Sequence, residues 1–293
     1  MKIALHARTF SEGSVADIER LIQALLKEKV SLAVSSVFAS SCPAEWIADY
    51  ELGVFSSEGP KDAQAIFSLG GDGTFLDTLT YVYKLGVPIL GINMGRLGFL
   101  THVLPKEIST SLKLFFEKKY SIENRTLVQL ETVPEVSWDI PIGLNEFTLL
   151  RRGDPSLIRI TCHLDNLLLN TYWADGIIIS TPTGSTAYSM SCGGPLIMPD
   201  SKSLVITPIN THNFNIRPFV VSDRSTIELR VGTSDSRIVA SLDSRNKYIH
   251  ASTLFRIRKS PYTAQLITLK DHHFIRALKS RLNWGTDLRN GSS

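Results

Sequence analysis

The first hundred residues alternate short apolar runs with amphipathic stretches, and this alternation constrains the fold more than any other feature of the chain. The runs 2–7, 30–38, 65–69 and 87–93 show little polar–apolar alternation, which is typical of strands buried on both faces. Between the first two runs, apolar side chains recur at helical spacing over residues 18–26. Strands separated by helices in this order predict a Rossmann-like α/β domain with a parallel sheet.

Capping residues indicate where the helices of this region begin and end. Ser14 is a favoured helix N-cap, and Asp17 would then occupy the third position, where a carboxylate is favourable. A second helix is predicted to begin near Thr74 and to end at Gly86, a residue typical of helix ends. A third helix is predicted over residues 105–119, with Pro105 near its start, where proline is favoured.

After about residue 101 the pattern changes from mixed helix and strand to mostly strand. Turn residues, namely Asp165, Asn166, Gly232 and Pro261, separate the apolar runs. The predicted strands are 127–133, 144–151, 157–173, 175–181, 203–209, 225–231, 237–243, 253–259 and 264–270. This succession predicts an antiparallel β-sandwich.

The end of the chain returns to a helical pattern, in which Phe274, Ile275, Leu278 and Leu282 share one face. A single helix has to bury such a face against another element, so we expect it to pack on the first domain. The predicted domains are therefore 1–102 with 270–293, an α/β domain that binds nucleotide or phosphate, and 103–269, a β-rich domain.

Charge and cysteine usage narrow the class of protein. The net charge of +3 is too small to indicate a nucleic-acid or membrane partner, and no apolar run is long enough for a membrane span. The three cysteines, Cys42, Cys162 and Cys192, are dispersed and odd in number, which indicates neither a disulfide framework nor a zinc site. We expect a cytoplasmic location and no metal held by side chains.

One glycine-rich turn, Gly70–Thr74, follows a predicted buried strand and surrounds the carboxylate of Asp72. Glycines allow a close backbone approach, and the N–H groups of a following helix attract phosphate. The turn is neither a Walker A loop nor a dinucleotide fingerprint, so a plain strand-to-helix turn with a capping aspartate stays open. Its position at the carboxyl end of a parallel strand, with an acid among phosphate-directed amides, favours phosphoryl transfer with Asp72 as a base or metal-holding group.

Three further motifs are candidates for a binding site. Residues 91–100 end another strand with three glycines, and Asn145 and Glu146 place an amide beside a carboxylate. Residues 175–195 begin with an apolar strand and continue with small hydroxyl residues, glycine and Tyr188, which suit a polar ligand with a ring. An inert Ser/Thr-rich loop is the alternative; the absence of a GxSxG pattern argues against a serine hydrolase.

Taken together, these motifs resemble the ATP-NAD kinase family. The resemblance rests on Gly70–Thr74, residues 91–100, Asn145-Glu146, residues 174–195, residues 206–221 and residues 242–244, in the order of the family. It implies transfer of the γ-phosphoryl group of ATP to the 2′-hydroxyl of the adenosine ribose of NAD, which gives NADP, with Asp72 as general base. It also implies Mg²⁺ or another divalent cation, and a homodimer or homotetramer.

The resemblance implies a residue set for each ligand. The phosphate-binding set is Gly70, Gly71, Gly73 and Thr74. The NAD-binding set is Asp72, Gly73, Phe99, Asn145, Glu146, Asp175, Thr186, Ala187, Tyr188, Ser189, Met190, Ser191, Asp243 and Arg245. Trp173 and Arg245 depart from the family pattern, which leaves NAD against NADH preference open.

Two other functions are compatible with parts of the sequence. A lipid kinase can carry the same glycine turn, but it would need an apolar or basic membrane-seeking segment, which the sequence does not show. A non-catalytic NAD(P) sensor would be favoured if Asp72 were replaced, and Asp72 is present.

Overall fold

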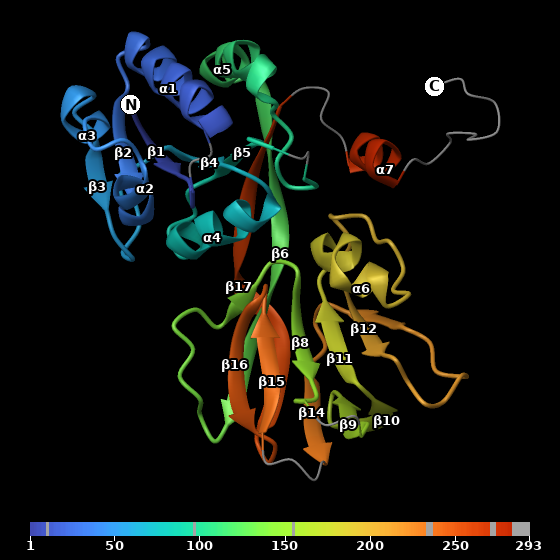
Figure 1. The fold of residues 1–293 in the computed structure, drawn as a ribbon. Coiled ribbons are helices and arrows are strands. Elements are labelled where there is room, and N and C mark those ends of the chain that lie inside the picture. The colour runs from blue at the N-terminus through green and yellow to red at the C-terminus, as the bar shows by residue number, and fades with distance from the viewer. Residues whose placement is uncertain (10–11, 96–97, 154–155, 233–236, 270–273, 283–293) are drawn as a thin grey trace. The chain divides into compact units, whose positions relative to one another are not determined.

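The computed structural model describes residues 1–9, 12–95, 98–153, 156–232, 237–269 and 274–282. By residue number the chain divides into two compact units. Unit 1 contains residues 1–124 and 264–293, and unit 2 contains residues 125–263. Figure 1 shows the chain coloured from blue at the N-terminus through green and yellow to red towards the C-terminus.

Unit 1 contains a parallel sheet. Its strands lie in the order β5 (Ile89–Ile92), β4 (Ala65–Leu69), β1 (Lys2–His6), β2 (Ser31–Ser35) and β3 (Gly53–Phe55). Every neighbouring pair in this order is parallel. The end of β17 (Leu254–Leu269) extends the sheet beside β5, where Leu266 pairs with Ile89 in parallel. The Rossmann-like α/β prediction is confirmed.

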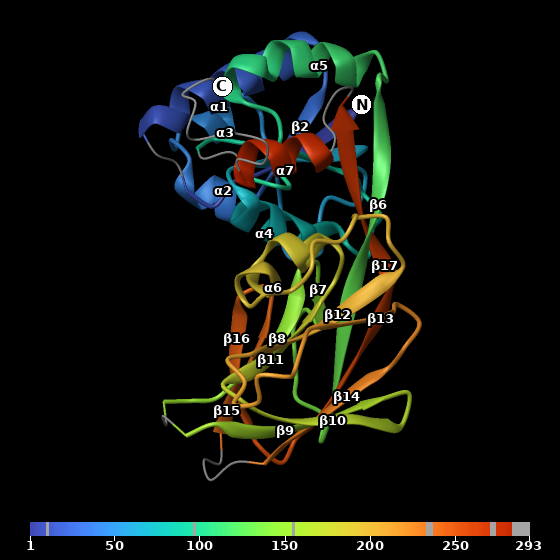
Figure 2. The same ribbon diagram turned by 90° about the vertical axis from the view of Figure 1, so that its right-hand side faces the viewer.

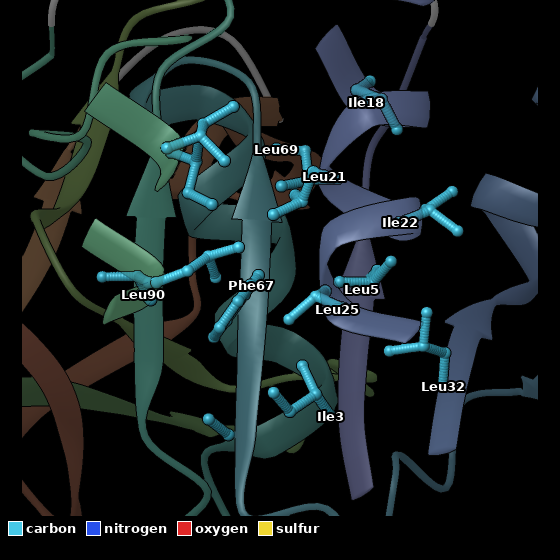
Figure 3. Packing of buried hydrophobic residues seen from close by; sticks show 14 of the residues in the cluster. Ile3, Leu5, Ile18, Leu21, Ile22, Leu25, Leu32, Phe67, Leu69 and Leu90 are labelled. Atoms are coloured by element: carbon cyan, nitrogen blue, oxygen red, sulfur yellow. The ribbon is translucent and has the colours of Figure 1, made fainter. Parts of the chain in front are cut away.

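Unit 1 also contains helices that bury apolar side chains. They are α1 (Glu12–Lys27), α2 (Ser36–Ser41), α3 (Trp46–Asp49), α4 (Asp72–Val82), a 3₁₀ turn (Pro105–Glu107) with α5 (Ile108–Phe116), and α7 (Phe274–Leu282). Figure 3 shows Leu21 and Leu25 of α1 turned towards Leu5 and Phe67 of the sheet, and all four side chains are 0% exposed. The apolar side chains at helical spacing on α1 therefore pack against β1 and β4. The glycine turn follows β4.

Helix α7 belongs to unit 1, as the sequence predicted. Leu278 is 5% exposed, and the ring of Phe274 lies 6.4 Å from the ring of Phe99 in the loop after β5. Ile275, predicted on the same apolar face, is 48% exposed. The helix therefore packs through a narrower face than the periodicity indicated.

Unit 2 is built from antiparallel strands, which Figure 2 shows from a second side. One sheet has the order β13 (Phe219–Ser222), β12 (Ser203–Ile209), β11 (Gly176–Ser180), β8 (Glu146–Leu150), β15 (Arg237–Leu242) and β16 (Arg245–His250). The other contains β10 (Leu167–Ala174), β9 (Ile158–Leu164), β14 (Ile227–Gly232) and the first part of β17, with β6 (Tyr120–Val133) pairing β17 and β7 (Ile142–Gly143).

The two sheets of unit 2 share one apolar core. Phe147 of β8 and Phe255 of β17 come from different sheets, and their ring centroids lie 5.7 Å apart. Alternating residues of both sheets are buried in the same cluster, as expected for a sandwich. The predicted antiparallel sandwich is confirmed.

Several predicted boundaries were wrong for local reasons. The second strand ends at Ser35, because the Ser35 hydroxyl accepts a hydrogen bond from the Phe38 N–H at 3.1 Å and caps α2. Helix α1 already includes Glu12, so Ser14 lies inside the helix and does not cap it. Helix α4 begins at Asp72, two residues before the predicted Thr74.

The predicted break at Pro261 is also wrong, because β17 runs through it as one strand of 16 residues. Pro261 is exposed, and proline is tolerated in a strand where its missing N–H does not have to pair. Within the described residues, no helix is long and apolar enough to cross a membrane.

Candidate functional site

The glycine turn of unit 1 connects β4 to α4 at the carboxyl end of the parallel sheet. Gly70 has a φ of +156°, and a Cβ on it would lie 2.3 Å from the Thr74 hydroxyl oxygen. Gly70 is therefore required by both backbone conformation and space. Of the three glycines in the turn, only Gly70 has a positive φ, whereas the sequence allowed one at each.

The first turn of α4 offers uncapped backbone donors. Gly71 is the N-cap residue and has no side chain that accepts from the helix N–H groups. Among the described residues, no atom lies within 4 Å of a Cβ built on Gly71. A Cβ on Gly73 would have the Nη1 of Arg8 as its neighbour at 3.5 Å. The turn thus presents open N–H groups, as an anion site requires, whereas the Arg8 guanidinium is paired with the Asp77 carboxylate.

The carboxylate of Asp72 is held by the loop that follows β5. Its Oδ2 accepts from the Phe99 N–H at 2.6 Å, and its Oδ1 accepts from the Leu100 N–H at 3.0 Å. The Thr101 hydroxyl donates to the same Oδ1 at 3.1 Å. Three donors from one short segment therefore fix the orientation of the carboxylate.

Gly98 allows this loop to approach Asp72. A Cβ on Gly98 would lie 1.6 Å from the Asp72 Oδ1 and 2.6 Å from the Thr101 hydroxyl oxygen. Only a residue without a side chain fits this place. The two glycine-rich motifs of the sequence thus meet around one carboxylate.

A series of buried hydrogen bonds between polar groups supports this arrangement of Asp72 and its donors. Thr101 is 0% exposed, and its hydroxyl accepts from the Asn93 side-chain amide at 3.0 Å. The Asn93 amide oxygen accepts from the Gly95 N–H at 2.7 Å. Because the Thr101 hydroxyl accepts from Asn93, its proton is directed to Asp72. Sequence reasoning missed Asn93 and Thr101, although both lie in or beside the second glycine motif.

In unit 2, the Asp243 carboxylate accepts hydrogen bonds from the backbone around Asn145 and Glu146. The Asp243 carboxylate accepts from the Leu144 N–H at 2.6 Å, the Asn145 N–H at 2.8 Å and the Glu146 N–H at 3.2 Å. Asp243 has a φ of +47° in the tight turn between β15 and β16. This turn aims its carboxylate at the start of β8, which brings three predicted site residues together.

Burial raises the pKa of Glu146 to about 8, and the negative charge of Asp243 adds to this effect. Glu146 is 8% exposed, and within the described residues its Oε2 has no hydrogen-bond partner. A buried carboxyl oxygen without a partner is costly and is a candidate ligand contact.

The Ser/Thr-rich segment packs directly on Asn145. The Thr181 N–H donates to the Asn145 carbonyl at 2.9 Å, and a Cβ on Gly184 would lie 2.0 Å from the same oxygen. The segment then forms a 3₁₀ turn (Thr183–Thr186) and α6 (Tyr188–Ser191). Small residues are therefore required here for close packing on the Asn145 backbone.

The side chains of this segment divide into buried and exposed ones. The Ser189 hydroxyl is buried and bonded to the Thr207 hydroxyl at 2.8 Å. Tyr188 is 40% exposed, and its pKa is raised first by burial and then by Cys192, Asp175 and Glu146. The remaining predicted residues are partly exposed or exposed: Thr186, Ala187, Met190 and Ser191.

Asp175 lies between two donors at the start of β11. It accepts from the Arg151 guanidinium at 2.6 Å and from the Asn210 side-chain amide at 2.9 Å. These bonds, first that from Asn210, lower the pKa of Asp175. Sequence reasoning missed both partners, because neither follows from spacing along the chain.

The two departures from the family pattern have different environments. Arg245 donates to the backbone carbonyls of Leu242, Ile140 and Ile142. Its guanidinium therefore connects the end of β15 to the segment before β8. Trp173 is 54% exposed on β10.

Within the described part of the chain, no group of three or more His, Cys, Asp or Glu side chains could hold a metal ion.

Sequence comparison covers nearly the whole chain. Residues 9–120 match the ATP-NAD kinase N-terminal domain, and residues 144–269 match the ATP-NAD kinase C-terminal domain. The NAD kinase of Flavobacterium psychrophilum is 40% identical over 294 residues, which cover 99% of this chain and 100% of that relative. The NAD kinase of Christiangramia forsetii is 38% identical over 295 residues, with the same coverage.

Two solved structures share the fold. The crystal structure of yeast NADH kinase complexed with NADH matches with a TM-score of 0.85 at 21% identity, covering 100% of this chain and 90% of that one. The crystal structure of an NAD kinase from Archaeoglobus fulgidus in complex with ATP matches with a TM-score of 0.73 at 26% identity, covering 97% and 99%. Both likenesses agree with an α/β part followed by a β-sandwich.

Proposed function

Because this chain belongs to the ATP-NAD kinase family and has the activity of an NAD kinase, we propose that Asp72 is the base of the reaction. In this proposal, the carboxylate of Asp72 accepts the proton of the 2′-hydroxyl of the adenosine ribose of NAD. The hydroxyl oxygen attacks the γ-phosphorus of ATP, and the bond from that phosphorus to the bridging oxygen breaks. The products are NADP and ADP.

The hydrogen bonding of Asp72 is the observation that carries the proposal. A carboxylate offers about four acceptor positions. Three are filled by the Phe99 N–H, the Leu100 N–H and the Thr101 hydroxyl. The carboxylate is thus oriented by two backbone N–H groups and one side-chain hydroxyl, and among the described residues one position is left for a substrate hydroxyl. Phosphoryl transfer depends more on such positioning than on a strong base.

The phosphates of ATP are proposed to bind at the glycine turn. The uncapped N–H groups at the start of α4 and the open space at Gly71 support this placement. A side chain at Gly71 would occupy the space that is proposed for the phosphates, which would explain a glycine at this position. Gly70, Gly71, Gly73 and Thr74 are the proposed contacts.

NAD is proposed to bind the polar groups of unit 2, and Asp72, Gly73 and Phe99 stay predicted NAD contacts. The Glu146 oxygen without a partner supports a contact to ribose hydroxyls, and the exposed ring of Tyr188 supports stacking. Asn145 and Asp175 are proposed for the adenine and the nicotinamide end. Asp243 positions the Asn145 backbone in this proposal.

Mg²⁺ is proposed to enter with the triphosphate. Mg²⁺ commonly binds through substrate phosphates and one or two protein carboxylates, so the triphosphate would supply most of its protein-independent ligands. No step of the proposed reaction is assigned to it.

The other proposals concern assembly and location. A homodimer or homotetramer and a cytoplasmic location stay predictions. The limits of the two domains, 1–102 with 270–293 and 103–269, also stay predictions. Membership of the ATP-NAD kinase family argues against the two alternative functions, a lipid kinase and a non-catalytic NAD(P) sensor.

The test compares NADP formation from NAD, ATP and Mg²⁺ by the wild type, Asp72→Asn and Asp62→Asn. Asp62 is an exposed carboxylate and serves as the matched control. Asp72→Asn is expected to lower kcat by about 10²–10⁴-fold while NAD still binds, and Asp62→Asn to leave kcat unchanged. A folded Asp72→Asn variant with wild-type kcat would refute the role of Asp72.

A further inference from the structure

We propose that Arg281 is a positioning residue for this reaction, which acts on Asp72 through one peptide unit, that between Gly98 and Phe99. Arg281 lies in the last turn of α7, 183 residues from the Gly98 carbonyl it contacts. The inference rests on the role proposed above for Asp72.

Helix α7 holds the loop after β5 at two points. The Nη2 of Arg281 donates a hydrogen bond to the Gly98 carbonyl oxygen. The Cζ of the same guanidinium stands 4.9 Å from the centre of the Phe99 ring, a cation–π distance. Phe274, at the other end of α7, places its ring 6.4 Å from that of Phe99.

The Gly98 carbonyl and the Phe99 N–H belong to the same planar peptide unit. In a trans peptide these two groups point in opposite directions. The carbonyl faces Arg281, and the N–H donates to the Asp72 Oδ2 at 2.6 Å. A donor on the carbonyl polarises the N–H and strengthens the bond that it makes. Arg281 therefore fixes the plane of this peptide and reinforces its bond to the carboxylate.

The loop after β5 lies very close to Asp72, so a small movement of the loop changes the hydrogen bonds to the carboxylate. The Gly98 Cα is so close to Asp72 that a Cβ there would lie 1.6 Å from the carboxylate oxygen. A rotation of the peptide would move the Phe99 donor away and change the approach of the Leu100 N–H to Oδ1. Without Arg281, the Phe99 N–H would no longer be held in place, which would weaken one of the three bonds that orient the carboxylate.

The charges of Arg281 and Asp72 also interact. Partial burial lowers the pKa of the Arg281 guanidinium, while the Asp72 carboxylate raises it.

The first experiment measures kcat, the KM for NAD and the KM for ATP in Arg281→Ala, Arg281→Lys and Arg276→Ala. Arg276 is an exposed arginine of the same helix and is the matched control. Arg281→Ala is expected to lower kcat by about 10- to 100-fold with both KM values within about threefold of wild type, because a misplaced base costs rate more than binding. Guanidinium ion is expected to restore part of the lost kcat, and Arg276→Ala to behave as wild type. An unchanged kcat in Arg281→Ala would overturn the proposal.

The second experiment repeats Arg281→Ala in the Asp72→Ala background, where no carboxylate is left to position. If Arg281 acts through Asp72, the residual rate of Asp72→Ala is unchanged by the second substitution. An equal fold-loss in both backgrounds would show a general structural role and overturn the proposal. If Asp72→Ala alone keeps wild-type kcat, the proposed function of Asp72 fails, which is a separate result from a failure of Arg281.

A folding control accompanies both experiments. Thermal unfolding is measured for every variant, and if Arg281→Ala does not fold, Arg281→Lys takes its place in the cycle. Lysine keeps one donor for the Gly98 carbonyl but lacks the planar guanidinium, so it is expected to lose part of kcat in the wild-type background only.

Discussion

Gly98→Ala is the most direct test of the geometry around Asp72. The added Cβ would lie 1.6 Å from the Asp72 Oδ1, where ordinary contact begins at 3.4 Å, so the carboxylate and the loop must separate by about 1.8 Å. The substitution thus separates the base from its donors with one methyl group.

The magnitude follows from the size of this displacement. A misplacement of about 1 Å can cost about 10²-fold in rate, so kcat is expected to fall by at least about 10²-fold, or about 2.7 kcal/mol of transition-state stabilisation. The loss should not exceed that of Asp72→Asn, because at worst the base is absent. Stability is expected to fall by about 1–3 kcal/mol, since bonds from Phe99 and Leu100 to a charged acceptor are weakened.

The assay is the initial rate of NADP formation at saturating NAD and ATP, with thermal unfolding measured in parallel. Gly95→Ala is the matched control from the same loop, because among the described residues no atom lies within 4 Å of its Cβ position. Gly95→Ala is expected to keep wild-type kcat. If folded Gly98→Ala also kept wild-type kcat, the held carboxylate of Asp72 would have no catalytic importance, and the reasoning would be refuted.

Two predictions concern unit 2. The pKa of Glu146 is about 8 in the folded state and 4.5 for an ordinary glutamate. Between these pH values the folded state therefore binds one proton more than the unfolded state. The free energy of unfolding should fall as pH rises from about 5 to about 8. The melting temperature of Glu146→Gln minus that of the wild type should increase over this window, and a constant difference would contradict the burial argument. Asp243→Ala removes the acceptor of three backbone N–H groups and is expected to lower the free energy of unfolding by about 2–4 kcal/mol, measured by urea denaturation. Asp200→Ala, at an exposed carboxylate of the same unit, should stay within about 0.5 kcal/mol of wild type, and an equal loss in both variants would contradict the prediction.

The fold class was predictable because its signals are local. Apolar strands such as 65–69 are buried along their whole length in a parallel sheet, as their lack of alternation indicated. The errors occurred where a local contact changed a boundary. The hydroxyl of Ser35 ended a strand by capping a helix, and the exposed Pro261 did not interrupt β17.

The candidate site was only partly predictable. Gly70 and Asp72 were found, because a glycine turn after a buried strand is a pattern of neighbours in sequence. Thr101 and Asn93 were missed, since a buried hydroxyl and amide carry no periodic signal. For Asp175, the bond to Arg151 spans 24 residues and that to Asn210 spans 35, distances at which sequence spacing says nothing about contact.

By itself, the sequence determined the alternation of strand and helix in the first hundred residues, the succession of strands after it, the place of the glycine turn at a strand end, and the presence of Asp72 within it. Those properties depend on side-chain periodicity and backbone preference over a few residues. The sequence did not indicate α2, α3 or β3. Only the tertiary structure decided what holds Asp72, because its nearest donor is 27 residues away and the arginine on the same peptide is 183 residues from that loop. Parallel strands bring their carboxyl ends to one edge, and the returning helix supplies Arg281 there; both are consequences of burying apolar faces that the chain cannot cover locally.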